Sequence, residues 1–178
     1  VCDNAVHYTG ANLRDFKHQY PLAGSEEGIR EIMSLLALQG VKKILTLRGE
    51  YEGYRHVGES RGIEVVEVEE DEVPMFAPAW FFLSNPSARD GNWLDTGLLS
   101  AILNSGHKVV YDMAYNWTAE GEHTMIQHPS VKMVLVSFSK PFGLFYHRIG
   151  FCFSRTEISV LAANKWFKSI PALLVAQA

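Results

Sequence analysis

A lysine lies where a buried strand is expected to end. Residues 131–136 form an apolar, β-branched run, and a second apolar run spans residues 149–153. Both are predicted to be buried strands. Lys140 follows the first run, with Ser137 and Ser139 just before it. A lysine that loses hydration at such a position has a lowered pKa and can act as a Schiff-base nucleophile. We therefore take Lys140 as the residue around which the chain is organised.

Donor groups suited to a phosphate accompany this lysine. Ser137, Ser139 and Arg148 offer hydroxyl and guanidinium hydrogen-bond donors. Gly24 and Ser25 open a predicted helix, whose first backbone N–H groups and dipole favour an anion. Ordinary structural roles remain open: Ser25 as a plain N-cap, and Arg148 in a surface ion pair.

An acid ends another apolar strand. Asp112 ends the apolar part of the strand predicted at residues 107–115, so its carboxylate is expected to be partly buried and to need a partner. A protonated ring nitrogen would serve. Tyr115, three residues further on, could reach the same ligand. The alternative for this pair is a solvated turn.

Predicted strands and helices alternate along the chain. The patterns favour strands at residues 41–47, 62–70, 79–87, 107–115, 131–136 and 149–153. They favour helices at residues 12–18, 25–39, 51–61, 94–104 and 156–168. This order predicts a three-layer α/β/α domain with a mainly parallel sheet and helices on both faces. Ligands of such sheets bind beyond the carboxyl ends of the strands, where Lys140 and Asp112 are expected.

Composition narrows the class of protein. The chain has 178 residues and a net charge of -4, which implies one domain or part of a larger protein and no general affinity for nucleic acid. Its apolar runs are too short for a membrane span. Cys2 and Cys152 suggest no disulfide framework, so a reducing cytoplasm is expected. The seven histidines lack metal-ligand spacing, and we interpret His123 and His128 as surface groups.

The C-terminal run is apolar and has no helix stop. This pattern favours a fragment of a larger protein or an apolar helix face that a partner covers.

Five motifs, in one order, resemble those of the fold-type I pyridoxal-phosphate enzymes, the aspartate aminotransferase superfamily. The lysine motif of that superfamily is S-x-[SA]-K, followed by a glycine and by an arginine eight residues after the lysine. The resemblance covers the chain from about residue 20 to residue 177. Its segments are residues 24–29, residues 49–54, Asn85-Pro86, Asp112-Met113-Ala114-Tyr115, and Ser137-Phe138-Ser139-Lys140 with Gly143 and Arg148.

The resemblance implies pyridoxal 5′-phosphate as cofactor and a role for each motif residue. Lys140 would form a Schiff base with the cofactor and then shuttle a proton, and Asp112 would pair with the pyridinium nitrogen. Tyr115 and Asn85 would hydrogen-bond the phenolic oxygen of the ring. Tyr51 would stack on the ring face. The phosphate would be held by Gly24, Ser25, the backbone at Glu26, Ser137 and Arg148.

The resemblance also implies the organisation and activity of the protein. Residues 1–20 would be a lead-in segment and residues 21–178 a cofactor-binding large domain without the family's small domain. The implied activity is transamination between an amino acid and a keto acid, both small-molecule substrates, by a homodimer. Three departures stand out: Glu26 near the phosphate, Gly49 where the family has a proline, and residues 87–91 without a second proline.

Other functions compete with this interpretation. The chain could be a truncated or decayed relative that acts as a cofactor-binding or structural module. The same scaffold also serves lyases and decarboxylases, which the motifs do not separate from transaminases. Ser137 and Lys140 match the S-x-x-K of penicillin-binding serine enzymes, but the Ser-Asp-Asn and Lys-Thr-Gly motifs of that class do not occur.

Overall fold

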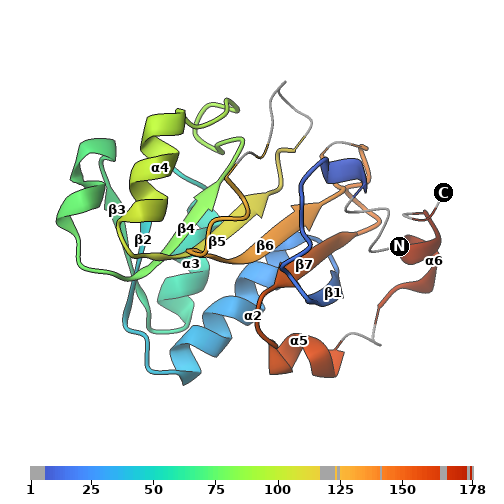
Figure 1. Ribbon diagram of the computed structural model, residues 1–178. Coiled ribbons are helices and arrows are strands. Elements are labelled where there is room, and N and C mark those ends of the chain that lie inside the picture. The colour runs from blue at the N-terminus through green and yellow to red at the C-terminus, as the bar shows by residue number, and fades with distance from the viewer. Residues whose placement is uncertain are drawn as a thin grey trace.

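A seven-stranded sheet forms the centre of the molecule. The computed structural model describes residues 7–116, 123, 125–140, 142–164, 168–175 and 177. The strand order is β1-β7-β6-β5-β4-β2-β3 (Figure 1). Neighbouring strands from β3 to β6 pair in parallel, whereas β7 is antiparallel to both of its neighbours. The strands are β1 His18–Leu22, β2 Lys43–Leu47, β3 Glu64–Val68, β4 Trp80–Ser84, β5 Lys108–Met113, β6 Val131–Ser137 and β7 Gly150–Ser154.

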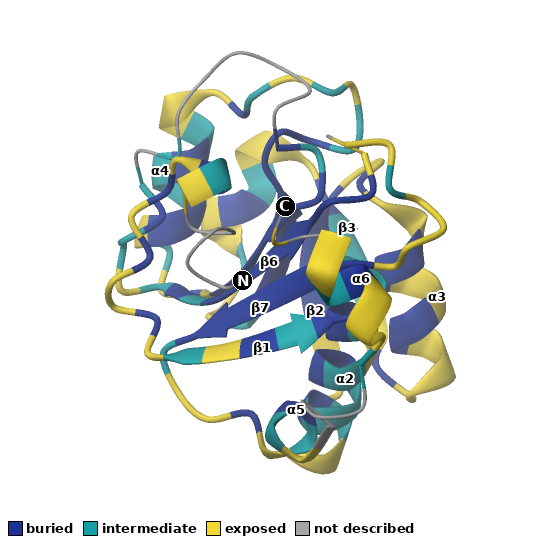
Figure 2. Ribbon diagram, turned by 90° about the vertical axis from the view of Figure 1, so that its right-hand side faces the viewer, coloured by how far each residue is buried: buried dark blue, intermediate teal, exposed yellow. Residues whose placement is uncertain are grey.

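Helices cover both faces of this sheet, which confirms the predicted three-layer α/β/α architecture (Figure 1). One face carries α2 Ser25–Leu38, α3 Glu52–Ser60 and α5 Ser159–Asn164. The other carries α4 Thr96–Asn104 and the 3-10 helix η1 Glu70–Met75. The last helix, α6 Ile170–Val175, presents a largely exposed surface (Figure 2). No helix in the described part of the chain is long and apolar enough to cross a membrane.

The two-residue period of the strands builds two separate cores. In β4, Phe81 and Leu83 pack on the α4 face and Phe82 packs on the α2 face. Every residue of β7 is buried, so β7 and its neighbour β6 lie in the interior of the molecule (Figure 2). Strands covered on both faces read as continuous apolar runs, which is why they could be recognised from the sequence.

The lead-in segment departs from the prediction. The helix expected at residues 12–18 is not formed, and His18–Leu22 pairs with β7 as strand β1 instead. Tyr20 and Leu22 alternate into the core, but the run is short and contains Pro21. A proline suits an edge strand, because one side of that strand needs no ladder hydrogen bonds. Tertiary pairing thus decides this segment.

Two other helical predictions change at their ends. Gly24, with φ 86°, occupies the N-cap position of α2, so the expectation that Ser25 is the N-cap is wrong. The cap has no side-chain hydrogen bond, and the Glu27 carboxylate accepts from the N–H of Ala23. The helix predicted at residues 156–168 is realised as the shorter α5, and residues 165–167 lie outside the described residues.

A glycine lets α2 approach the sheet closely. A Cβ atom at Gly28 would lie 2.5 Å from Leu135 Cδ2 and 2.9 Å from Leu22 Cδ1. Both contacts are shorter than two carbon atoms tolerate. The absence of a side chain at this position therefore sets how near the N-terminus of α2 lies to the carboxyl ends of β1 and β6.

We predict that Gly28→Val destabilises the fold by roughly 2 kcal/mol, because overpacking forces α2 away from the sheet. Glu31→Val is the matched control: it places the same side chain on a half-buried position of the same helix. The control should cost less than about 1 kcal/mol, the difference in helix propensity. Urea unfolding measures both values. Equal costs for the two variants would show that the close approach at Gly28 is unimportant.

Candidate active site

A cavity of about 350 Å³ opens at the carboxyl edge of the parallel strands. Such an edge is where α/β sheets bind ligands. Ser84 ends β4, Asp112 lies near the end of β5 and Ser137 ends β6, so three adjacent strands contribute to one wall. Eight of the ten predicted cofactor-binding residues line this cavity: Ser25, Glu26, Tyr51, Asp112, Tyr115, Ser137, Lys140 and Arg148.

Lys140 lies at the mouth of the cavity. Its Nζ is 3.4 Å from the centroid of the Tyr115 ring, a cation–π contact. The residue is exposed, so the expectation of an ammonium buried at a strand end is wrong. Lys140 follows the last residue of β6 by three positions, and this places its amine beyond the sheet. The amine is therefore open to solvent and to a ligand entering the cavity.

Asp112 is the buried acid of the site. Its side chain accepts hydrogen bonds from the Tyr54 hydroxyl (Oη to Oδ2, 3.1 Å) and from the Ala114 N–H (to Oδ1, 2.9 Å). Burial raises its pKa to about 6, although these hydrogen bonds and the charge of Lys140 act in the opposite direction. The carboxylate is thus held in place by neutral donors, as an ion partner for a ring nitrogen must be.

Tyr54 has no role in the sequence-based prediction, although it falls within the recognised segment at residues 49–54. Its ring is completely buried, and its hydroxyl proton points to Asp112. Burial, reinforced by the charge of Asp112, raises its pKa well above the ordinary tyrosine value. The spacing Tyr51-x-x-Tyr54 places both rings on one face of the start of α3, which is the signal that could have identified it.

Arg148 and the start of α2 form a group of donors at one end of the cavity. Arg148 Nη2 donates to the Ala23 carbonyl oxygen (3.2 Å), and a Cβ atom at Gly24 would lie 2.5 Å from the same nitrogen. Gly24 therefore contributes by making room for the guanidinium, although it does not line the cavity. Arg148 itself has a φ of 52°. A left-handed non-glycine residue costs about 1–3 kcal/mol and is typical of functional sites.

The hydroxyl groups after β6 face the same cavity. Ser139 is 7% exposed, and its Oγ has no hydrogen-bond partner among the described residues. Ser137 Oγ accepts from the Ser139 N–H (3.3 Å). A buried hydroxyl without a partner is costly unless a ligand or water completes it. Together with Arg148, these hydroxyls provide donors for an anion.

Glu26, the acid expected to conflict with a phosphate, has its own partners. Its Oε2 accepts from the Tyr51 hydroxyl (3.1 Å), and its Oε1 pairs with Arg30 Nε (3.0 Å). Burial and the charge of Glu26 raise the pKa of Tyr51 to about 12. The Tyr51 ring meets Tyr54 edge-on, with centroids 5.5 Å apart. The carboxylate of Glu26 thus orients Tyr51 at the cavity.

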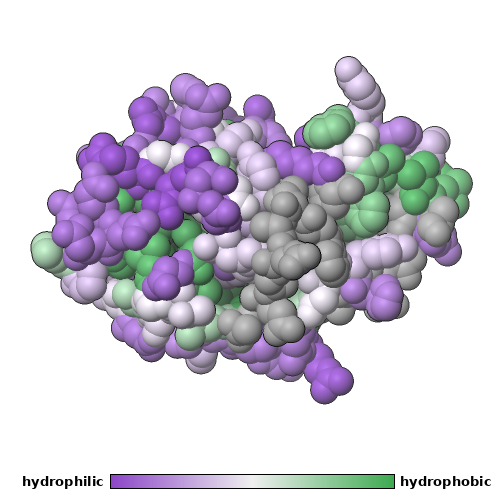
Figure 3. Space-filling view, turned by 90° about the horizontal axis from the view of Figure 1, so that it is seen from above, coloured by the Kyte–Doolittle hydropathy of each residue, from purple (hydrophilic) through white to green (hydrophobic). Residues whose placement is uncertain are grey.

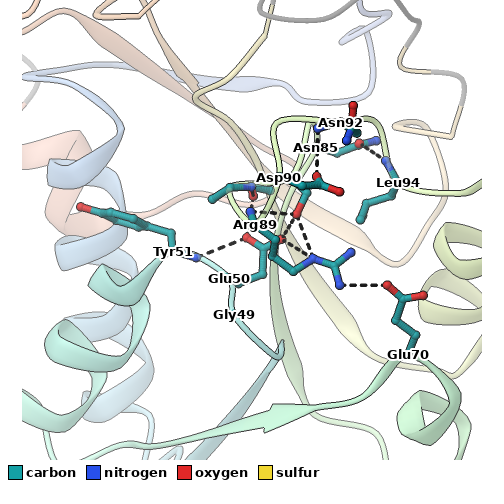
Figure 4. A network of polar contacts seen from close by, with 12 residues as sticks. Gly49, Glu50, Tyr51, Glu70, Asn85, Arg89, Asp90, Asn92 and Leu94 are labelled. Atoms are coloured by element: carbon teal, nitrogen blue, oxygen red, sulfur yellow. Dashed lines mark hydrogen bonds and ion pairs between the residues drawn. The ribbon is translucent and has the colours of Figure 1, made fainter.

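Asn85 is not brought into the cavity lining. Its Nδ2 donates to the Tyr111 hydroxyl (2.6 Å). Its Oδ1 accepts from the Leu94 N–H (2.9 Å), as Figure 4 shows. The Tyr111 hydroxyl also contacts His123 Nδ1 (3.2 Å). The interpretation of His123 as a surface group is therefore wrong. Its ring is half-buried, and burial lowers its pKa to about 4, so it is neutral at pH 7.

Comparison with known proteins decides the family. Residues 19–171 match the profile of the family "Aminotransferase class I and II". The chain belongs to this family. A histidinol-phosphate aminotransferase 2 from Archaeoglobus fulgidus is 30% identical over 110 residues, which are 61% of this chain and 29% of that protein.

Solved structures share the fold of this chain. L-threonine-O-3-phosphate decarboxylase from Porphyromonas gingivalis superposes with a TM-score of 0.75 at 18% identity, over 98% of this chain and 58% of that one. Histidinol-phosphate aminotransferase from Sinorhizobium meliloti, solved with pyridoxal 5′-phosphate, has a TM-score of 0.76 at 21% identity, over 98% and 52%. The chain thus spans about half the length of these solved structures.

Membership of this family makes pyridoxal 5′-phosphate the cofactor, and the described residues fit it. The test is local: an unpartnered buried hydroxyl, Ser139 Oγ, faces the cavity beside Arg148, and only a glycine at position 24 leaves room for the guanidinium. At the end of the cavity where the ring nitrogen would bind, the hydrogen-bond donors that the described residues offer to Asp112 are both neutral.

The raised pKa of Asp112 predicts a pH-dependent stability. The folded protein holds this proton more tightly than the unfolded chain, so stability falls as the pH rises from about 4 to about 6. The loss is on the order of 3 kcal/mol for a shift of about two units in pKa. Asp112→Asn removes this titrating group and with it the pH-dependent loss. The free energy of unfolding of the variant, compared with that of wild type, should therefore be higher at about pH 7 than at about pH 4.

Urea unfolding of both proteins at the two pH values measures this difference. The titration of His123 contributes equally to both proteins and cancels. A free-energy difference between variant and wild type that does not change with pH would contradict the buried, raised-pKa carboxyl group.

Proposed function

We propose that this chain is the cofactor-binding large-domain portion of a pyridoxal-phosphate-dependent aminotransferase, with residues 21–178 as that domain and residues 1–20 as a lead-in segment. The observation that carries the proposal is the shared cavity of Lys140, Asp112 and Arg148. An amine, a buried acid and a fixed guanidinium are the groups needed to bind an aldehyde, a pyridine nitrogen and a phosphate.

The position and charge of each cavity residue determine its role in binding the cofactor. When bound, pyridoxal phosphate supplies an aldehyde for a Schiff base and a ring that accepts electrons. Lys140 would provide the amine that reacts with this aldehyde, and its Nζ would move a proton during the reaction. Asp112 places a negative charge at the ring nitrogen. Tyr51 and Tyr115 border the ring, and Arg148 holds the phosphate with the hydroxyls and helix N-terminus beside it.

The proposal extends to the whole protein. Its small-molecule substrates would be an amino acid and a keto acid, and it would act as a cytoplasmic homodimer. Exposed apolar side chains support a protein interface: Ile170 is 70% exposed and Leu174 59% exposed on α6. In Figure 3, hydrophobic surface gathers on the side of the molecule where α6 lies in Figure 1.

Absorption spectroscopy tests the cofactor role. Addition of pyridoxal phosphate to the protein should produce a visible Schiff-base band that borohydride removes. Lys140→Ala should abolish the band, because the reacting amine is lost. Lys132→Ala is the matched control, since Lys132 lies on β6 itself and its Nζ donates to the Pro129 carbonyl oxygen. A folded wild-type protein without the band, or an unchanged band in Lys140→Ala, would contradict the proposal.

Product analysis separates the candidate reactions on this scaffold. With an amino acid as the donor, transamination predicts release of the matching keto acid without carbon dioxide. The structural similarity to a decarboxylase makes carbon dioxide release the informative alternative. Cofactor binding without either product would favour a cofactor-binding module that has lost catalysis.

A further inference from the structure

A second buried acid lies directly behind the cavity wall. Glu50 follows β2 and immediately precedes Tyr51, and its side chain is 0% exposed. A buried carboxylate is strongly unfavourable unless hydrogen bonds replace its hydration. Glu50 is therefore expected to have hydrogen-bond partners that compensate for its burial. The family resemblance described above assigns no role to this residue.

Two serine hydroxyls satisfy this carboxylate. Ser84 Oγ donates to Glu50 Oε2 (2.5 Å), and Ser87 Oγ donates to Glu50 Oε1 (2.7 Å). Arg89 Nε lies 3.9 Å from Oε1 and adds a positive charge (Figure 4). Each carboxylate oxygen thus has a hydroxyl donor of its own, and both donors come from the segment that ends β4 and follows it.

The hydroxyl protons of Ser84 and Ser87 are directed to Glu50, because each serine oxygen already accepts a hydrogen bond from an N–H group. Ser84 Oγ accepts from the Ala88 N–H (2.7 Å), and Ser87 Oγ accepts from the Arg89 N–H (3.3 Å) and Nε (3.1 Å). Since N–H donors occupy both oxygens, each hydroxyl proton needs an acceptor at Glu50. A carboxylate supplies two acceptors, whereas an amide supplies one acceptor and one donor. Glutamine has the right shape here and the wrong hydrogen-bonding pattern.

This arrangement, which we call the Glu50 clasp (Glu50, Ser84, Ser87 and Arg89), connects two loops at the carboxyl edge. Glu50 belongs to the loop after β2, and the other members end β4 or follow it. Arg89 Nη1 continues the connection to Glu70 Oε1 in η1, after β3 (2.8 Å). Figure 4 shows the side chains of Glu50, Arg89 and Glu70 meeting from separate ribbons.

The clasp adjoins the cavity through one of its members, Ser84, and through the adjacent residues Ala88 and Tyr51. Ser84 and Ala88 line the cavity, and so does Tyr51, whose N–H donates weakly to Glu50 Oε2 (3.4 Å). The carboxylate therefore ties the backbone that carries Tyr51 to the cavity-lining residues Ser84 and Ala88. The charge of Glu50 is also one of the contributions that raise the pKa of Asp112.

We infer that Glu50 is a positioning residue: it locks the loop that carries Tyr51 to the loop after β4, and so fixes the wall against which the cofactor ring binds. This inference rests on the proposed function for its consequence, since the ring is that of pyridoxal phosphate. The lock itself is a property of the protein without cofactor.

The first arm of the test needs no cofactor. Hydrogen exchange of backbone amides is measured in wild type, Glu50→Gln and the matched control Glu70→Gln. Glu50→Gln should speed exchange at residues 49–51 and 85–92 by about tenfold, because a buried hydroxyl loses its acceptor. Glu70 is an exposed partner of the same Arg89, so Glu70→Gln should stay near wild type. Equal exchange in wild type and Glu50→Gln, or equal acceleration in both variants, overturns the inference.

The second arm measures the effect on the cofactor. Glu50→Gln should raise the dissociation constant for pyridoxal phosphate by about tenfold. It should also weaken the circular dichroism of the bound cofactor at saturation, which reports how rigidly the ring is held. A purely structural role would change stability and leave that band unaltered, and such a result overturns the positioning role.

Two further outcomes are distinguishable. If Glu50→Gln does not fold, Ser87→Ala removes one hydroxyl of the clasp and should give smaller changes in the same direction, whereas unchanged exchange in Ser87→Ala overturns the inference. If wild type fails to bind pyridoxal phosphate, the proposed function is overturned and with it the role toward the ring. The hydrogen-exchange arm still decides whether Glu50 locks the two loops.

Discussion

The direction of the strands is the constraint on which the site depends. Parallel pairing sets Ser84 of β4 opposite Asp112 of β5. The following strand, β6, ends at Ser137, so Lys140 emerges at the same edge. The antiparallel strand β7 begins where the parallel strands end, and this brings Arg148 there as well. Strand β1 runs parallel to β6 on the far side of β7 and delivers the start of α2.

Charge is distributed so that the cations of the cavity stay available. Asp112 takes its hydrogen bonds from Tyr54 and a backbone N–H, and Glu50 takes its own from serine hydroxyls. Within the ranges that the structure describes, neither Lys140 nor Arg148 forms an ion pair with an acid of the site. Hydroxyl and backbone N–H donors thus hydrogen-bond the two buried carboxylates, with Arg89 close to Glu50, so that Lys140 and Arg148 are not needed to neutralise them.

Local patterns were enough to predict the alternation of strands and helices, because strands buried on both faces carry long apolar runs. Motif order then placed Lys140, Asp112 and Arg148 at one edge. Pairing between distant segments was harder to foresee. Strand β1 forms because β7 provides an edge with which it can pair. Pro21 makes this segment unlike a strand in the sequence, so the pattern did not predict it. The side chain of Asn85 is directed to Tyr111 by contacts that no spacing encodes.

The contacts of the buried acid at position 50 could not be predicted from the sequence either. In the sequence, Glu50 is one charged residue among several, and its neighbours resemble a solvated turn. Only the folded chain places two serines from another loop on its oxygens. Its consequence for Tyr51 could therefore not be derived from the motif in which both residues lie.

Lys140 is the amine that we propose to bind the cofactor. The most direct measurement is borohydride reduction of the protein with bound pyridoxal phosphate, followed by proteolysis and mass spectrometry of the peptides. The account predicts that the phosphopyridoxyl group is recovered on the peptide that contains Lys140. Its recovery on other lysines, or spread evenly over the surface, would contradict the account.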